Sequence, residues 1–152
     1  CLHLGETKVT NASTRALGGM HCLEELDLLD TRVDEDGLRD LGASKSLERL
    51  TLGRDQITGE AFAELPPQLR RLSLFETRIS ARSLTHLSKL AHLRELHIYG
   101  ARIDDSAVEG LVALAGLTRL TVSDTALTRE GIAQLRARMP RCAIDACESS
   151  ST

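Results

Sequence analysis

A leucine recurs at a nearly fixed spacing along this chain. Five of these leucines fall in one column when the sequence is shifted against itself, with successive offsets of 24, 22, 24 and 24 residues: Leu23, Leu47, Leu69, Leu93 and Leu117. Each one begins a block with the frame LxxLxLxxTxV. A single block of this length cannot bury its apolar side chains alone, so neighbouring blocks must stack. The spacing therefore predicts an array of repeated units.

Each block combines two periodicities. The LxL element alternates apolar and polar residues, as in a short strand with one buried face. The 10 to 13 residues that follow change to helical spacing, for example at Leu84, Leu87 and Leu90. We therefore expect one strand, one turn and one helix per repeat. Because a helix is wider than a strand, the stack should curve, with parallel strands on the concave face and helices on the convex face.

Composition and charge support a repeat with an unusual core. The chain has 27 leucines in 152 residues but only three aromatic residues, so the core must be built almost without rings. The formal charge of −3, from 22 acidic and 19 basic residues, gives no overall field that would attract nucleic acid or an acidic membrane. No apolar run reaches the roughly 18 residues that span a bilayer. We expect neither a nucleic-acid nor a membrane partner.

Partial copies of the repeat lie at both ends. Leu2 and Leu4 match the strand leucines of the next block, and Cys142 and Ile144 occupy strand positions of a closing half repeat. We therefore expect a repeat domain over residues 1–146 and a disordered polar tail over 147–152.

Residues suited to cap a helix stand at one position in six blocks: Thr10, Asp34, Thr58, Ser80, Asp104 and Thr128. Pro66 and Pro67 should end the helix of the third block early.

The LxxLxLxxT frame resembles that of leucine-rich repeat proteins, specifically the kind whose repeats of 22 to 24 residues contain a helix. The resemblance implies a right-handed α/β solenoid and, from what the family usually does, protein binding. The family usually places Asn or Cys at one turn position, where this chain has Thr7, Thr31, Asp55, Thr77, Ala101 and Thr125. Since the Ala101 side chain cannot form hydrogen bonds, we expect a weaker turn there.

The sequence contains no motif of a known catalytic or metal site. GxSxG, GxxxxGK[ST], HExxH and GxGxxG are all missing. The histidines fall in unrelated columns, except His3 and His97, which lie about 19 Å apart at strand spacing. No two of the four cysteines form a CxxC pair, and Cys142 fills a leucine position as a small apolar residue. We expect no enzymatic activity, no cofactor and no metal.

The outward positions of the strands point to a binding surface. Between the two strand leucines the column reads His3, Asp27, Thr51, Ser73, His97 and Thr121, and the next outward column reads Gly5, Leu29, Gly53, Phe75, Tyr99 and Ser123. Phe75 and Tyr99 are neighbours there, with Leu29 nearer the N-terminal end. Aromatic anchors dominate many protein interfaces, so we expect this part of the concave face to bind a protein. The alternative is that the two rings only pack against each other or against a turn.

Charged residues on the same face are segregated along the sequence. The second repeat supplies Glu24, Glu25, Asp27 and Asp30, whereas the next two supply Arg49, Arg54, Arg70 and Arg71 beside Glu48 and Glu76. An acidic end beside a basic middle would orient a partner of opposite pattern, so we add Asp27, His97, Arg49 and Arg71 to the expected partner-binding set. The alternative is pairing within the chain, which would contribute little stability.

We interpret the chain as a non-enzymatic protein-binding module whose protein partner the sequence does not identify. A second interpretation is a regulatory or substrate-selecting domain of a larger polypeptide, such as a ubiquitin ligase component or a bacterial effector, because the N-terminal strand would otherwise have an open edge. A third is a binder of small anions or nucleic acids through Arg49, Arg54, Arg70, Arg71 and Arg94. Open edges also permit self-association, and the localisation stays open, with the cell interior slightly favoured.

Overall fold

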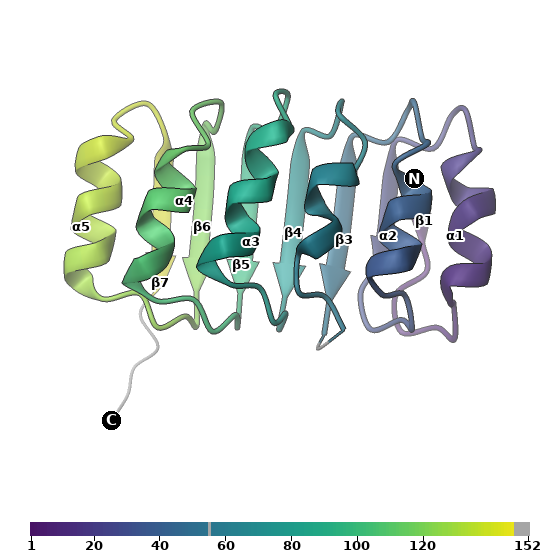
Figure 1. Ribbon diagram of the computed structural model, residues 1–152, viewed down its shortest axis with the longest axis horizontal. Helices are drawn as coiled ribbons and strands as arrows, with labels where there is room; N and C mark the ends of the chain where they lie inside the picture. The colour runs from purple at the N-terminus through teal and green to yellow at the C-terminus, as the bar shows by residue number, and fades with distance from the viewer. Residues whose placement is uncertain (55, 148–152) are drawn as a thin grey trace.

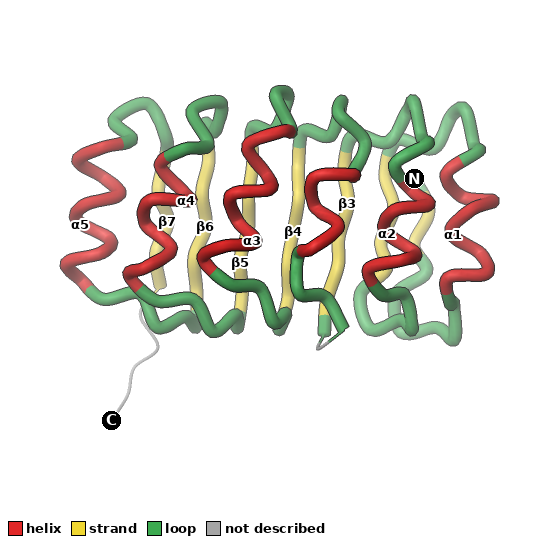
Figure 2. The backbone as a smooth tube through the Cα atoms, in the orientation of Figure 1, coloured by secondary structure: helices red, strands yellow, loops and turns green. Residues whose placement is uncertain are grey.

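The computed structural model describes residues 1–54 and 56–147, so the expected tail from 148 onward and the turn residue Asp55 lie outside the described residues. One parallel sheet carries seven strands in sequence order: β1 (Leu2–His3), β2 (Glu25–Leu28), β3 (Arg49–Gly53), β4 (Arg71–Phe75), β5 (Glu95–Tyr99), β6 (Arg119–Ser123) and β7 (Ala143–Cys147). Figure 1 shows all helices on one face of this sheet, and Figure 2 shows the loops confined to its two ends.

Each strand returns to the next through a helical segment. These segments are α1 (Asn11–Gly18), α2 (Glu35–Leu41), η1 (Glu60–Glu64), α3 (Ala81–His86) with η2 (Leu87–Lys89), η3 (Asp105–Ala107) with α4 (Val108–Val112), and α5 (Arg129–Arg138). The row of helices in Figure 1 extends beyond the row of strands at both ends, so the sheet lies on the concave side. The right-handed α/β solenoid expected from the sequence is confirmed.

The leucine columns of the sequence form the core between sheet and helices. Strand pairing places Leu26, Leu50, Leu72, Leu96 and Leu120 side by side, and each is at most 1% exposed. Phe62 of η1 is fully buried in this core. Because the register is continuous from β2 to β7, every outward-facing residue also has a neighbour one repeat away. This register positions the candidate site.

The last strand extends further than expected. β7 includes Cys147, which pairs with Ser123 of β6, so the strand passes the expected domain boundary at residue 146 by one residue. The difference arises because the register of the closing repeat is shifted by two residues: Ile144 pairs with Leu120, and Ala146 pairs with Val122. The expected strand position of Cys142 is therefore wrong, since Cys142 precedes β7.

The starts of the helices follow the cap column in four of six repeats. Asp34, Ser80, Asp104 and Thr128 each accept a hydrogen bond from a backbone N–H of the first helical turn. Thr10 precedes α1 without such a bond. The expectation for Thr58 is wrong: the N-cap residue of η1 is Gly59, at φ +86°, and the Glu35 side chain of the preceding repeat accepts the hydrogen bonds of the backbone donors.

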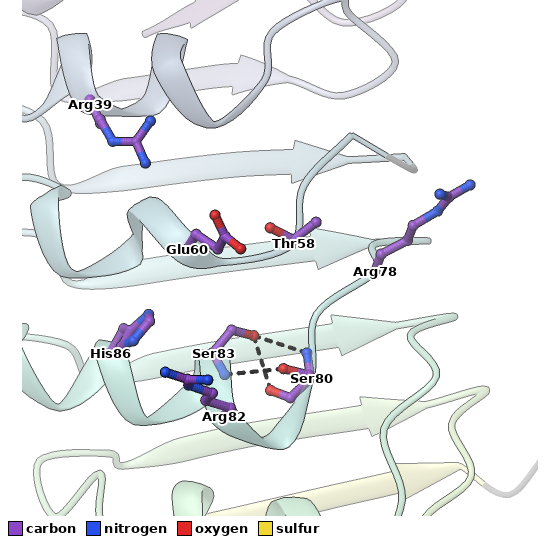
Figure 3. Close-up of a pocket in the computed structure, with 8 residues that line it drawn as sticks. All are labelled: Arg39, Thr58, Glu60, Arg78, Ser80, Arg82, Ser83 and His86. Carbon is purple, nitrogen blue, oxygen red and sulfur yellow. Dashed lines mark hydrogen bonds between the residues drawn. The ribbon is translucent and has the colours of Figure 1, made fainter.

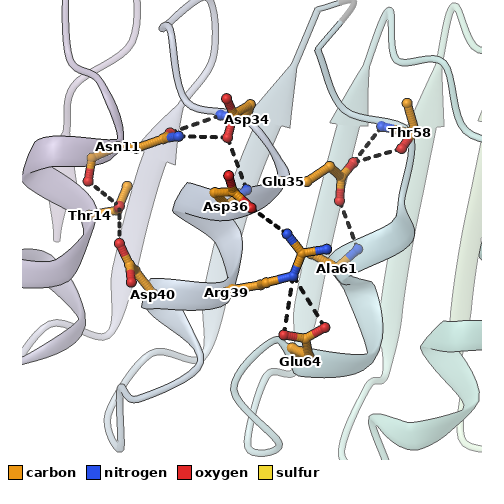
Figure 4. A network of polar contacts seen from close by, with 10 residues as sticks. All are labelled: Asn11, Thr14, Asp34, Glu35, Asp36, Arg39, Asp40, Thr58, Ala61 and Glu64. Carbon is orange, nitrogen blue, oxygen red and sulfur yellow. Dashed lines mark hydrogen bonds and ion pairs between the residues drawn. The ribbon is translucent and has the colours of Figure 1, made fainter.

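That side chain belongs to a second set of contacts, which we call the inter-repeat caps. The residue after the cap position in one repeat bonds the cap region of the next (Figure 4). Asn11 accepts from the Asp34 amide at 3.1 Å, and Asp105 accepts from the Thr128 amide at 2.9 Å. Glu35 accepts from Thr58, Gly59 and Ala61. In the two middle repeats the same position is Gly59 or Ala81, whose side chains cannot make this contact.

The turns after the strands share a strained backbone position. One residue per repeat has a left-handed φ there: Glu6, Asp30, Arg54, Glu76, Gly100 and Asp124, at 51° to 74°. Only glycine adopts this conformation without a steric penalty, so five repeats tolerate it with a side chain present. The parallel stacking of the turns requires the same bend in every repeat, whatever residue occupies it.

The third repeat is irregular for the reason the sequence indicated. Leu65 is extended, with ψ 156°, because it precedes Pro66, and the helical segment before it is a short η1 rather than an α-helix.

The threonines of the turn column differ in their hydrogen bonds. The Thr31 hydroxyl donates to the Leu28 carbonyl at 2.9 Å, whereas the buried Thr77 hydroxyl has no hydrogen-bond partner among the described residues.

Candidate partner-binding face

The concave face is built from three parallel columns of outward side chains. The first contains Glu25, Arg49, Arg71, Glu95 and Arg119, the second contains His3, Asp27, Thr51, Ser73, His97, Thr121 and Asp145, and the third contains Gly53, Phe75, Tyr99, Ser123 and Cys147. Strand alternation directs all three toward the side opposite the helices. Leu29 follows β2 directly and lies at the N-terminal end of the third column.

The third column carries an apolar row made of Leu29, Phe75 and Tyr99. The two rings stack, with centroids 4.7 Å apart and planes 14° from parallel. Stacking covers one face of each ring, so both side chains are half-buried and not fully exposed. The rings therefore pack against each other, and both also contribute to the concave surface.

Gly53 makes this row continuous, a role the sequence analysis missed. A Cβ built on Gly53 would lie 2.3 Å from the Leu29 Cδ1 atom and 3.3 Å from the Phe75 Cβ atom. Leu29 therefore lies across the glycine on the side of Phe75, and any side chain at position 53 would displace it. The sequence signal for this role is that Gly53 stands between two large apolar residues, Leu29 and Phe75, in one repeat column.

His97 connects the apolar row to the charged column. Its ring lies 6.4 Å from that of Tyr99 and nearly parallel to it, and its side chain is only 16% exposed. One ring nitrogen lies 3.0 Å from the Thr121 hydroxyl, and the other lies 3.5 Å from the Glu95 carboxylate. Arg71 binds the same carboxylate at 2.8 Å. Glu95, which was not among the expected partner-binding residues, therefore holds both His97 and Arg71.

The charges on this face are paired within the chain. Arg49 lies 3.3 Å from Glu25 on the neighbouring strand. Arg119 lies 3.2 Å from Asp145 in the same way. Asp27 accepts a hydrogen bond from the Leu29 amide at 2.9 Å. Acidic and basic residues that are separated along the sequence thus pair with each other across neighbouring strands, and the face offers little unbalanced charge to a partner.

The five arginines of the anion-binding interpretation are occupied as well. Arg54 pairs with Asp30 at 3.0 Å, and Arg70 pairs with Glu48 at 3.5 Å. Arg94 donates to main-chain carbonyls at the ends of two repeats. With Arg49 and Arg71 paired as described above, this set is not arranged as an open basic patch.

The helical side carries a separate pocket of about 460 Å³ between η1 and α3. Its lining includes Arg39, Arg82, His86 and Glu60, drawn in Figure 3. Arg39 is already paired with two carboxylates, and the His86 Nδ1 atom lies 3.2 Å from the Gly59 carbonyl oxygen. Glu60 supplies a negative charge to the same space. The mixed lining does not select one ligand class.

The described residues contain neither a metal-binding cluster nor a disulfide. No group of three or more His, Cys, Asp or Glu side chains there is arranged to hold a metal ion. All four cysteines are unpaired, and burial raises the pKa of the Cys142 thiol. No helix within residues 1–54 and 56–147 is long and apolar enough to cross a membrane.

Comparison with known proteins gives a structural match without a sequence match. No protein-family model matches the chain, and no curated protein matches it in sequence. Among solved structures, internalin C2 of Listeria monocytogenes is 23% identical over 89% of this chain, with a TM-score of 0.64. Another internalin of the same organism is 18% identical over 98% of the chain, also with a TM-score of 0.64.

The chain spans 55% and 49% of the two internalin chains, about half of each. Internalins are leucine-rich repeat proteins, and a parallel seven-stranded sheet with one helical segment per repeat is the architecture of that fold. The chain therefore has the leucine-rich repeat fold that its sequence frame indicated.

Proposed function

We propose that this chain is a non-enzymatic protein-binding module that engages a protein partner through its concave face. The observation that carries the proposal is the apolar row of Leu29, Phe75 and Tyr99, which lies on a face whose charges are otherwise paired. Folds of the internalin type are typically protein-binding scaffolds without enzymatic activity. A rigid row of this kind resembles the aromatic anchors of protein interfaces.

The charge pairing favours one kind of partner. Because Arg49 and Arg71 already have carboxylate partners, a highly charged partner would have to break those pairs to bind. A partner that presents apolar or aromatic side chains can instead pack on the row and leave the ion pairs intact at its rim. Such binding should change little with ionic strength, since unpaired long-range charge contributes little to it.

A crosslinking experiment tests the proposal and locates the surface. A photoreactive amino acid is placed either at Ser73 on the concave face or at Thr85 on α3, which belongs to the same repeat but the opposite side. Both proteins are irradiated in lysate of the source cell. We expect an adduct from position 73 that is absent from position 85.

The adduct should then be lost when both rings are removed. Truncating an anchor residue typically costs at least about 2 kcal/mol of binding energy, or about thirtyfold in Kd. The test variant is therefore Phe75→Ala with Tyr99→Ala, and the matched control is Met20→Ala, which removes a 45% exposed apolar side chain away from the face. Circular dichroism verifies folding. An adduct that persists in the ring variant, or that forms equally from position 85, contradicts the proposal.

The second interpretation, a substrate-selecting domain of a larger polypeptide, would use the same surface. In that case the protein captured at position 73 would be modified or relocated by the remaining part of the polypeptide. Identification of the captured protein separates the two interpretations.

A further inference from the structure

Three side chains with nucleophilic and acid–base chemistry lie in a line at the N-terminal edge of the concave face. The Cys1 Sγ atom lies 3.0 Å from the His3 Nε2 atom, and the His3 Nδ1 atom lies 3.8 Å from the Asp27 Oδ2 atom. The imidazole is therefore between a thiol and a carboxylate, with one ring nitrogen toward each.

The strand pairing accounts for this arrangement. Cys1 and His3 are two residues apart along the strand direction, so their side chains point to the same face. His3 and Asp27 are register partners on adjacent parallel strands. The Asp27 carboxylate is held in place because its Oδ1 atom accepts a hydrogen bond from the Leu29 amide at 2.9 Å. The order of residues along and across the strands brings the three groups together.

A line of this kind has a defined chemical consequence. An imidazole that is hydrogen-bonded to a thiol can accept its proton as the thiol reacts, and the resulting thiolate is the nucleophilic form of cysteine. A carboxylate on the other ring nitrogen orients the imidazole and stabilises its protonated form. Cys1 and His3 are both exposed, so a reagent in solution can reach the sulfur. The groups lie in a row, whereas metal ligands converge on a common point.

The other cysteines provide a comparison within the same chain. Cys22 and Cys147 are also exposed, but no histidine is hydrogen-bonded to either in the part of the chain that the structure describes. Cys142 is partly buried, and burial raises the pKa of its thiol. Three cysteines are thus exposed, but among the described residues a histidine contact is present at Cys1 alone.

We propose that Cys1 is a thiol-exchange site that reacts with low-molecular-weight disulfides. The Cys1 thiolate attacks one sulfur of the disulfide, a new S–S bond forms to Cys1, and the original S–S bond breaks. The second sulfur leaves as a thiolate and receives the proton that His3 took from Cys1. The step exchanges one disulfide for another and needs no further oxidant or reductant. No oxyanion has to be stabilised, because the negative charge passes from sulfur to sulfur.

The test compares single-cysteine variants. One protein retains only Cys1, through Cys22→Ser, Cys142→Ser and Cys147→Ser, and the matched control retains only Cys22. Each is mixed at pH 6 with an aromatic disulfide reagent that releases a coloured thiolate. We expect Cys1 to react about tenfold faster than Cys22, because His3 is placed to take the proton of the Cys1 thiol.

Two substitutions assign that excess rate to the line of residues. His3→Gln in the Cys1-only protein should reduce its rate to that of the Cys22-only protein, and Asp27→Asn should give a rate between the two. Every Cys1-only variant has the same N-terminus, so the difference measures the imidazole and the carboxylate alone. In guanidinium chloride, where the strand pairing is lost, the Asp27→Asn effect should disappear.

The natural class of reagent is tested last. Incubation with glutathione disulfide should add one glutathione to Cys1 in the unmodified chain, as detected by mass spectrometry of its peptides, before any of the other cysteines is modified. Equal rates for Cys1 and Cys22, an unchanged rate in His3→Gln, or first modification at another cysteine would each overturn the proposal.

Discussion

Replacement of Glu35 should destabilise the chain more than that of any surface residue beside it. The Glu35 Oε1 atom accepts hydrogen bonds from the Thr58 amide at 2.6 Å, the Thr58 hydroxyl at 3.0 Å and the Gly59 amide at 2.8 Å, and its Oε2 atom accepts one from the Ala61 amide at 2.7 Å. Hydrogen bonds to a charged group each contribute about 1.5–3 kcal/mol, but water can replace some of them because the site is only partly buried. We therefore expect a loss of about 3 kcal/mol for Glu35→Ala.

The glutamine variant separates charge from shape. Glu35→Gln retains one acceptor oxygen, but its amide group presents a donor to the N–H groups that the second carboxylate oxygen bound. We therefore expect it to lower the free energy of unfolding by roughly 1.5 kcal/mol, half the loss expected for Glu35→Ala. Unfolding in urea measures both values, provided that the slope with denaturant is unchanged. In a chain of this length a loss of 3 kcal/mol corresponds to a decrease in Tm of about 10 °C. Hydrogen exchange should accelerate at the Gly59 and Ala61 amides.

The matched control is Glu60→Ala, which removes a carboxylate from an exposed position in the same region. A substitution of that kind usually changes stability by no more than about 0.5 kcal/mol. If Glu35→Ala and Glu60→Ala cost the same, the inter-repeat cap has no energetic role, and the argument from its four hydrogen bonds is refuted.

Three other substitutions test separate features. Thr77→Val should stabilise the fold by about 1 kcal/mol in urea unfolding, because it removes a buried hydroxyl without a partner among the described residues; a loss of stability would mean that the hydroxyl is satisfied. Glu76→Gly should stabilise by about 0.5–1 kcal/mol, since Glu76 has a left-handed φ of 51° as Gly100 does, and an unchanged urea midpoint would argue against strain. The hydrogen bond from Asn11 lowers the pKa of Asp34 from its ordinary 3.8, so this carboxylate stabilises the fold above that pH and the contribution is lost as the pH falls through the folded pKa. Asn11→Ala should therefore cost more stability at pH 7 than at pH 3, and an equal cost at both would refute the linkage.

The sequence predicted the fold because every repeat contains the same information. Leucines at equivalent positions of successive blocks can only be buried together if the blocks stack in register, and the strand pairing of Leu26 with Leu50 and of Leu72 with Leu96 follows. The capping residues Ser80 and Thr128 were also predictable, because a helix start is determined by a few adjacent residues.

Contacts between repeats were harder to predict. Thr58 is not a cap because Glu35, 23 residues earlier, supplies the acceptor, and local sequence around Thr58 contains no sign of that. The compensation of Arg49 by Glu25 follows from the register, but it is hidden when charges are grouped repeat by repeat. Neither the stacking of the two rings nor the position of Leu29 across Gly53 can be derived from spacing, since both depend on side-chain conformation.

The distribution of the inter-repeat caps has a mechanical consequence. A solenoid bends by small rotations at each junction between neighbouring units, and polar contacts across a junction resist such rotation. These contacts are present where Asn11, Glu35 and Asp105 reach the next unit, and the junctions on either side of the fourth unit have Gly59 and Ala81 instead. Phe75 lies on that fourth unit. The two junctions beside the unit that carries Phe75 therefore lack this cap and are crossed by other contacts, His86 to Gly59 and Arg71 to Glu95. We expect the curvature to adjust to the shape of a partner more readily at these two junctions than at the capped ones.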